Sequence, residues 1–159
     1  MTEFSMSRRA MLGTGTWALV GAVALPTSAR AEVWAGLSST NEQTIRKYYA
    51  GWEKKDWGAV DALLADNFTF TSAAPDDHIS KSTFKTQCWD TQSSLIEAFD
   101  FERVFGHGDE AFVEYVCRTK NGTSFRNVEY HRLRDRKVAA IQCYFGGAGY
   151  PSAADEGQK

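Results

Sequence analysis

The chain has 159 residues and is nearly neutral, with 18 lysines and arginines against 20 aspartates and glutamates. Apolar residues make up 43% and aromatic residues 13%, a globular composition that excludes disordered, collagen-like and coiled-coil chains. The near-neutral charge also excludes the broad cationic surface that non-specific binding to nucleic acid requires. This length predicts one folded domain.

The first 31 residues have the pattern of an export signal. Arg8 and Arg9 precede an almost uncharged apolar run over 11–25, and residues 29–31 (Ala-Arg-Ala) resemble a cleavage site. The run of about 15 residues is shorter than the roughly 20 that a membrane-spanning helix needs. Residues 7–12 resemble the twin-arginine consensus, so we expect a periplasmic or secreted protein with no membrane contact after cleavage. An ordinary secretory signal and an uncleaved anchor are the alternatives.

Three helices are expected after the signal. Ser39 and Glu42 form a capping box, and aromatic residues at helical spacing predict a helix over about 41–54. Asp56 can cap a second, short helix, and Ser80 starts a third.

Strands are predicted where polar and apolar residues alternate. The expected strands are 68–71, before the third helix, and then 97–105, 111–119, 124–134 and 138–145. Helices first and an antiparallel meander afterwards indicate an α+β fold. We divide the chain into a signal peptide (1–31), a linker (32–39), a folded domain (40–147) and a flexible tail (148–159).

This order of elements resembles the nuclear-transport-factor-2-like superfamily, in its SnoaL-like branch. Three patterns carry the resemblance: Tyr48-Tyr49-Ala50-Gly51-Trp52 with Asp66 to Phe70, Pro75 to Ile79, and Phe125 to Glu129 followed by Val138 and Tyr144 to Gly146. The resemblance implies a cone-shaped roll, a curved antiparallel sheet wrapped around three N-terminal helices. It also implies a protein without a cofactor that forms a homodimer through the outer face of the sheet. The family contains enzymes, binding proteins and assembly domains alike.

The register of strand 124–134 decides which polar residues face the interior, because a shift of one residue inverts every side chain. Two-residue turns at both ends would place one set inside: Arg126, Val128, Tyr130 and Arg132. Three-residue loops with a bulge would place the other set inside: Phe125, Asn127, Glu129, His131 and Leu133. The family's three-residue loop at the position of 135–137 favours the second register.

Glu129 is then the central candidate for a catalytic residue. A carboxyl group in an aromatic-lined cavity is costly to desolvate, so we expect a raised pKa that suits a general acid or base. The alternative is a hydrogen-bonded Glu129 that only holds the shape of the domain. Asp77 and His78 are further candidates, with His78 as a proton carrier pointing inward. In the alternative, Asp76 or Asp77 caps the following helix.

The ketosteroid-isomerase relatives imply further roles. Their helix-one tyrosine matches Tyr48, and the acid on their penultimate strand matches Glu129, so these two would stabilise an oxyanion if Glu129 stays protonated. The position of their catalytic base falls at Ser72, which is not a base, and this makes steroid-type isomerisation doubtful unless Asp77 or His78 substitutes.

Two functions remain open. In the first, the cavity holds a small, largely apolar molecule, with or without isomerase, cyclase or dehydratase chemistry; the expected wall residues are Trp52, Phe70, Trp89, Tyr115, Asn127 and Phe145. In the second, the interior is packed solid and the domain is a non-catalytic dimerisation or assembly module. A pocket of about 300 Å³ or more would favour the first. The single cysteines and histidines show no metal-site spacing, so we expect no metal.

Replacing Arg8 and Arg9 with Lys tests the export signal. If the signal is a twin-arginine signal as predicted, the uncleaved precursor should accumulate in the cytoplasm, as detected by fractionation and immunoblotting. Normal export of this double variant would contradict the twin-arginine route and favour an ordinary secretory signal.

Overall fold

The computed structural model describes residues 33–72 and 76–145, so the predicted signal peptide and the predicted tail lie outside the described residues. The described strands form one seven-stranded sheet in the order β1-β4-β5-β6-β7-β2-β3. The strands are β1 (Val33–Leu37), β2 (Leu64–Thr71), β3 (Ile79–Ser80), β4 (Ile96–Gly108), β5 (Glu110–Thr119), β6 (Ser124–Arg134) and β7 (Lys137–Phe145). The helices are α1 (Ser39–Lys54), α2 (Trp57–Leu63) and a continuous segment made of α3 (Lys81–Phe84), the π-helical turn η1 (Lys85–Trp89) and α4 (Asp90–Gln92). The predicted α+β class is confirmed.

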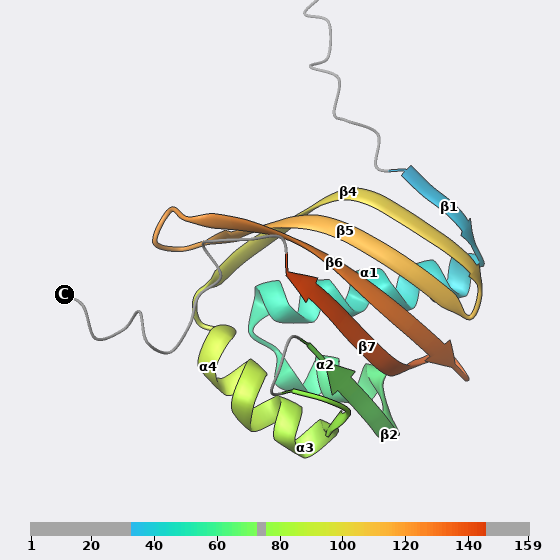
Figure 1. Ribbon diagram of the computed structural model, residues 1–159, viewed down its shortest axis with the longest axis horizontal. Helices are drawn as coiled ribbons and strands as arrows, with labels where there is room; N and C mark the ends of the chain where they lie inside the picture. Colours follow the sequence, from blue (N-terminus) through green and yellow to red (C-terminus); the bar gives the residue numbers. More distant parts are fainter. Residues whose placement is uncertain (1–32, 73–75, 146–159) are drawn as a thin grey trace, which may run out of the picture. The chain divides into compact units, whose positions relative to one another are not determined.

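The sheet curves around α1. Figure 1 shows α1 lying along the inner side of β4–β7, with α2 and the α3–α4 segment near the end of the sheet where β2 and β7 lie. The predicted meander β4–β7 is antiparallel throughout, whereas β1 pairs with β4 and β2 pairs with β7 in parallel. The whole sheet is therefore mixed, with an antiparallel centre.

A side-chain oxygen caps the N-terminus of each of α1, α2 and α3. Ser38 Oγ accepts a hydrogen bond from the backbone N–H of Asn41 at 3.2 Å, so the cap of α1 is Ser38 and not the predicted Ser39. The predicted caps Asp56 and Ser80 are confirmed at α2 and α3. Glu42 does not complete a capping box; it forms an i,i+4 ion pair with Arg46 at 2.9 Å.

The inner face of β6 is the one that the sequence analysis favoured. The buried residues of this strand are Phe125, Asn127, Glu129, His131 and Leu133. The reason given for this register was wrong in part, because Asp135 and Arg136 form a two-residue turn with positive φ at both positions. A bulge in β7 beside Ala139 restores the alternation, since Leu133 pairs with Val138 while Arg132 pairs with Ala140.

The segment assigned to a linker contains β1, which the sequence did not reveal. Trp34 on this strand lies under the guanidinium of Arg46, 3.8 Å from ring centroid to Cζ, and contacts Phe101 edge-on. Gly36 has a φ of +79°, and a Cβ there would lie 1.9 Å from the carbonyl oxygen of Gly106. Only glycine therefore lets β1 approach β4 this closely.

Apolar side chains from α1, the α3–α4 segment and the inner face of the sheet form the core. The three cysteines of the chain, Cys88, Cys117 and Cys143, are buried within it as free thiols. In the described part of the chain, no helix is both long and apolar enough to cross a membrane.

Candidate functional site

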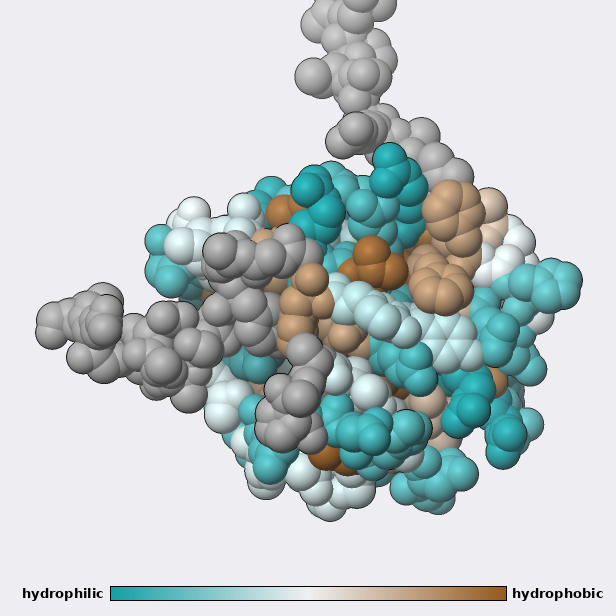
Figure 2. Space-filling model, viewed as in Figure 1, coloured by the Kyte–Doolittle hydropathy of each residue, from teal (hydrophilic) through white to brown (hydrophobic). Residues whose placement is uncertain are grey.

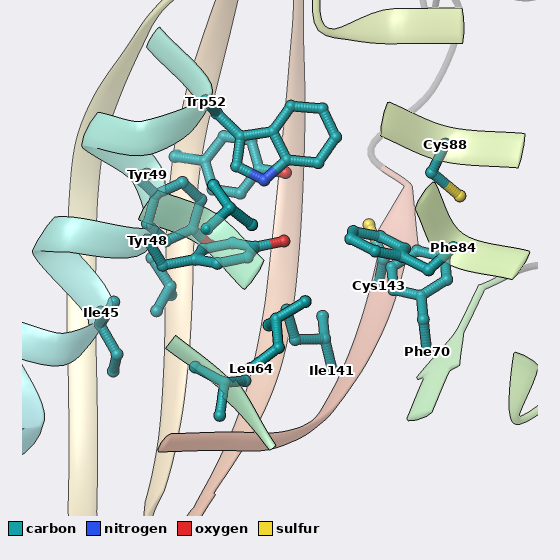
Figure 3. Close-up of a cluster of buried hydrophobic side chains, with 14 of the residues drawn as sticks. Ile45, Tyr48, Tyr49, Trp52, Leu64, Phe70, Phe84, Cys88, Ile141 and Cys143 are labelled. Carbon is teal, nitrogen blue, oxygen red and sulfur yellow. The ribbon is translucent and has the colours of Figure 1, made fainter. Parts of the chain in front are cut away.

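A small cavity lies between α1, the α3–α4 segment and the inner face of the sheet, and its volume is about 40 Å³. Figure 3 shows the aromatic side chains that surround it. The lining residues are Tyr48, Tyr49, Trp52, Phe70, Phe84, Cys88, Gln92, Ile96, Phe99, Tyr115, Phe125, Asn127, Glu129 and Cys143. Glu129 is the one charged residue in this lining.

The carboxylate of Glu129 is buried and held by three donors from α1, β5 and β6. The hydroxyl of Tyr49 donates to Oε2 at 2.7 Å, and the hydroxyl of Tyr115 donates to Oε1 at 2.8 Å. His131, two residues along the same strand face, places Nε2 3.2 Å from Oε2 and 3.0 Å from the Tyr49 hydroxyl. Each carboxylate oxygen therefore accepts at least one hydrogen bond inside the core.

This arrangement shifts the pKa of Glu129 in the direction opposite to the expected one. Burial acts to raise the pKa, as the sequence analysis assumed, but the hydrogen bond and charge of His131 and the hydroxyls of Tyr49 and Tyr115 outweigh burial. The pKa of Glu129 lies below its ordinary value, so the prediction of a raised pKa was wrong. Glu129 is ionised near neutral pH and accepts hydrogen bonds; it is not poised to act as an acid.

The tautomer of His131 follows from its neighbours. An ionised Glu129 can only accept, so Nε2 of His131 carries the proton that faces Oε2. The other ring nitrogen, Nδ1, is buried and has no hydrogen-bond partner.

The network continues from Tyr115 to Asn127. The side-chain amide of Asn127 donates to the Tyr115 hydroxyl at 3.3 Å and lies 3.5 Å from the sulfur of Cys143. Asn127 thus orients the hydroxyl that Tyr115 presents to Glu129. The predicted cavity positions of Asn127 and Glu129 agree with this geometry, and their functional roles stay predictions.

Tyr48 does not hold Glu129, contrary to the expected pairing of these two residues. Its neighbour Tyr49 makes that contact, and Tyr48 instead lines the cavity, where its ring lies edge-on to Trp52 with 6.4 Å between ring centroids. Successive residues of a helix differ by about 100° in direction, so the two tyrosines meet β6 differently: Tyr49 brings its hydroxyl to Glu129, whereas the Tyr48 ring contacts His131 edge-on with 5.7 Å between ring centroids. Figure 3 shows the Tyr48 hydroxyl pointing into the space between α1 and the α3–α4 segment.

Asp77 and His78 lie outside the cavity, so the expectation that His78 points inward was wrong. Their side chains are 77% and 67% exposed, and His78 Nδ1 lies 2.5 Å from Asp77 Oδ1. His78 lines a different depression of about 60 Å³ with Arg132 and Thr71. Since Arg132 alternates with the buried His131, this depression is on the outer face of the sheet. Neither Asp77 nor His78 caps α3, a role that Ser80 has.

The expected aromatic wall is present in part. Trp52, Phe70 and Tyr115 line the cavity. Trp89 is buried behind Trp52, with 4.6 Å between ring centroids, and does not reach the cavity. Phe145 is 37% exposed and lines a separate groove of about 360 Å³. Within residues 33–72 and 76–145, no three His, Cys, Asp or Glu side chains are placed to hold a metal ion.

Tyr49 and His131 are the site residues that the sequence analysis missed. His131 shares a strand face with Glu129, so the favoured register already placed both side chains inside. The sequence does not single out Tyr49, because the helical pattern of α1 allows both Tyr48 and Tyr49 to face inward.

The family model of the SnoaL-like domain matches residues 45–141, which include most of α1, all of α2 and most of the sheet. The chain belongs to the SnoaL-like domain family. A search of curated proteins found no match to it.

Solved structures share the fold of this SnoaL-like domain at low sequence identity. An NTF2-like protein of unknown function from Cytophaga hutchinsonii is 16% identical, with a TM-score of 0.55 over 69% of this chain and 92% of that one. A Kribbella flavida protein provisionally assigned as a ketosteroid isomerase is 15% identical, with a TM-score of 0.58 over 76% and 88%. TerC, crystallised with polyporic acid, is 16% identical, with a TM-score of 0.57 over 67% and 92%. At these identities the likeness shows the fold alone.

Replacing Tyr49 with Phe tests the hydrogen bonds to Glu129. The variant keeps the ring but loses a donor to a buried charge, so urea denaturation near pH 7 should show a loss of about 1.5–3 kcal/mol in the free energy of unfolding. Because the folded-state pKa of Glu129 is lowered, its carboxylate stabilises the fold above the unfolded-state pKa, and this contribution is lost as the pH falls through the folded-state value. The difference between wild type and variant should therefore shrink on acidification.

Tyr48→Phe is the matched control, because its hydroxyl makes no direct hydrogen bond to Glu129. It should cost clearly less than Tyr49→Phe and show a weaker dependence on pH. Equal losses for the two variants, or a Tyr49→Phe loss that does not change with pH, would contradict the geometry described here.

Proposed function

We propose that this SnoaL-like domain binds a small, largely apolar molecule in the cavity beside Glu129. The observation that carries the proposal is the buried, ionised carboxylate at the wall of an otherwise uncharged aromatic cavity. Burying a charge is expensive, and a core that only needed to be filled would be as stable with apolar side chains. A binding site gains from the same charge, because it orients a polar group of the ligand.

The size of the cavity limits the ligand. A volume of about 40 Å³ holds about three water molecules, at roughly 10–15 Å³ each. Cys143 lines both this cavity and the groove of about 360 Å³ beside Tyr144 and Phe145. We therefore propose that the cavity takes a very small molecule, or one end of a longer molecule whose body lies in the groove.

The lowered pKa makes Glu129 a weak proton acceptor as well as a poor acid. An oxyanion site of the isomerase type needs a protonated acid, whereas the pKa of Glu129 is lowered and its carboxylate already accepts hydrogen bonds. Ser72, at the position of the isomerase base, donates its hydroxyl to Asp76 at 3.1 Å and lines the groove. Binding is accordingly the core of the proposal, and steroid-type isomerisation is not part of it.

Native mass spectrometry of the mature protein, purified from its own host, tests ligand binding. The wild type should carry a bound small molecule that is released on denaturation, and Glu129→Gln should lose it. Glu114→Gln is the matched control: Glu114 lies in β5 on the outer face and pairs with Arg103 at 2.7 Å. A ligand that Glu129→Gln retains as well as Glu114→Gln does would contradict a role for Glu129 in binding.

The second candidate function is a dimerisation or assembly module, and the small cavity volume favours it. The outer face of the sheet carries exposed aromatic side chains, among them Phe112 (49% exposed), whose ring makes a tilted contact with that of Tyr130, and Tyr144 (53% exposed). Figure 2 shows apolar side chains gathered over β4–β6, among polar ones. Arg126 and Glu102 form an ion pair at 2.8 Å on the same sheet. We propose that two copies pair through this face in an isologous dimer.

Sedimentation at micromolar concentration tests the dimer. The mature wild type should have about twice the monomer mass, and Phe112→Glu should shift it to the monomer because a charge would be buried at the interface. Lys120→Glu, in the loop between β5 and β6, is the control and should remain dimeric. A monomeric wild type would contradict the proposal.

We also propose that the mature protein is periplasmic or secreted. The twin-arginine pattern supports this proposal, and the double replacement of Arg8 and Arg9 tests it.

A further inference from the structure

The lining of the cavity carries one charged side chain, the carboxylate of Glu129. Its lining contains neither lysine nor arginine, and Glu129 faces tyrosine hydroxyls and one imidazole. The charge acts across the cavity: burial, and after it the negative charge of Glu129, raise the pKa values of Tyr48 and Tyr115. An anionic group entering this space would be repelled by the same charge.

The rest of the lining suits a cation. Aromatic faces attract positive charge, and they do so more strongly where water is excluded. Four rings from three segments, those of Tyr48, Trp52, Phe84 and Phe99, line the cavity together with the carboxylate. Aromatic faces combined with one carboxylate make the environment in which proteins recognise ammonium groups.

We infer that the ligand presents a protonated amine on a short alkyl segment to the carboxylate of Glu129. This inference rests on the proposed function, because it requires that the cavity binds a small molecule. Losing water is costly for the ammonium group, and the nearby carboxylate and rings offset that cost. The carboxylate needs no rearrangement, since Tyr49, Tyr115 and His131 already hold it dehydrated and ionised. A neutral hydroxyl group would make a hydrogen bond without the attraction between opposite charges.

Three probes of equal chain length separate the possibilities: n-propylamine, 1-propanol and propionate. Near pH 7 the first is a cation, since alkyl amines resemble lysine with a pKa of about 10.4, the second is neutral and the third is an anion. Each is titrated into the mature wild-type protein to about 50 mM, because ligands of so few atoms bind with Kd values on the order of 1 mM. The readouts are the NMR signals of the Trp52 indole N–H and the Ile96 methyl groups, which report on the cavity.

The amine should bind at least tenfold more tightly than the alcohol, and propionate should not bind. Glu129→Gln should abolish the preference for the amine, whereas Glu114→Gln should keep it. Tyr49→Phe retains the carboxylate and should also prefer the amine, which keeps the test decisive if Glu129→Gln does not fold. If the alcohol binds as tightly as the amine, the amine inference is overturned while cavity binding stands. If no probe shifts either signal, both the amine inference and the proposed binding of a small molecule in the cavity are overturned.

Discussion

The burial of the Glu129 carboxylate among three donors is the interaction on which the rest of the site depends. Those donors come from different parts of the chain: Tyr49 from α1, Tyr115 from β5 and His131 from β6 itself. A charge buried without such partners would destabilise the fold by several kcal/mol. The requirement to satisfy it therefore fixes how far α1 lies from the sheet and how it is rotated. The same contacts leave the carboxylate ionised at the wall of the cavity.

This constraint also decides which chemistry the site can support. A lowered pKa removes Glu129 from the group of buried acids that donate a proton to an oxyanion. It makes the residue a fixed acceptor in an aromatic setting, which suits recognition of a donor or a cation. The fold alone would not have made this distinction, because likeness to a fold does not transfer chemistry. The distinction comes from two tyrosines, one histidine and the register of β6.

Much of the fold could be predicted from the sequence, because the elements between α1 and β7 have strong periodicity. The bounds expected for β6 match, and those of the other meander strands differ by at most three residues at either end. β1 had no comparable signal: it is a short strand that pairs in parallel with β4, far along the chain, so distant backbone contacts define it. The choice between Tyr48 and Tyr49 failed for a related reason, since it depends on how α1 is rotated against the sheet. The prediction for Asp77 and His78 failed because both residues come after a loop, and the sequence does not show which way that loop turns their side chains.

The most direct test of the central claim is an NMR titration of the side-chain carboxyl carbon of Glu129 in the folded mature protein. The donors around it predict a pKa below the value of about 4.3 for an unperturbed glutamate, with the carboxylate ionised near neutral pH. A Glu129 signal that titrates at or above that value would show that burial outweighs the three donors, and it would contradict both the ionised site and the ligand chemistry inferred from it.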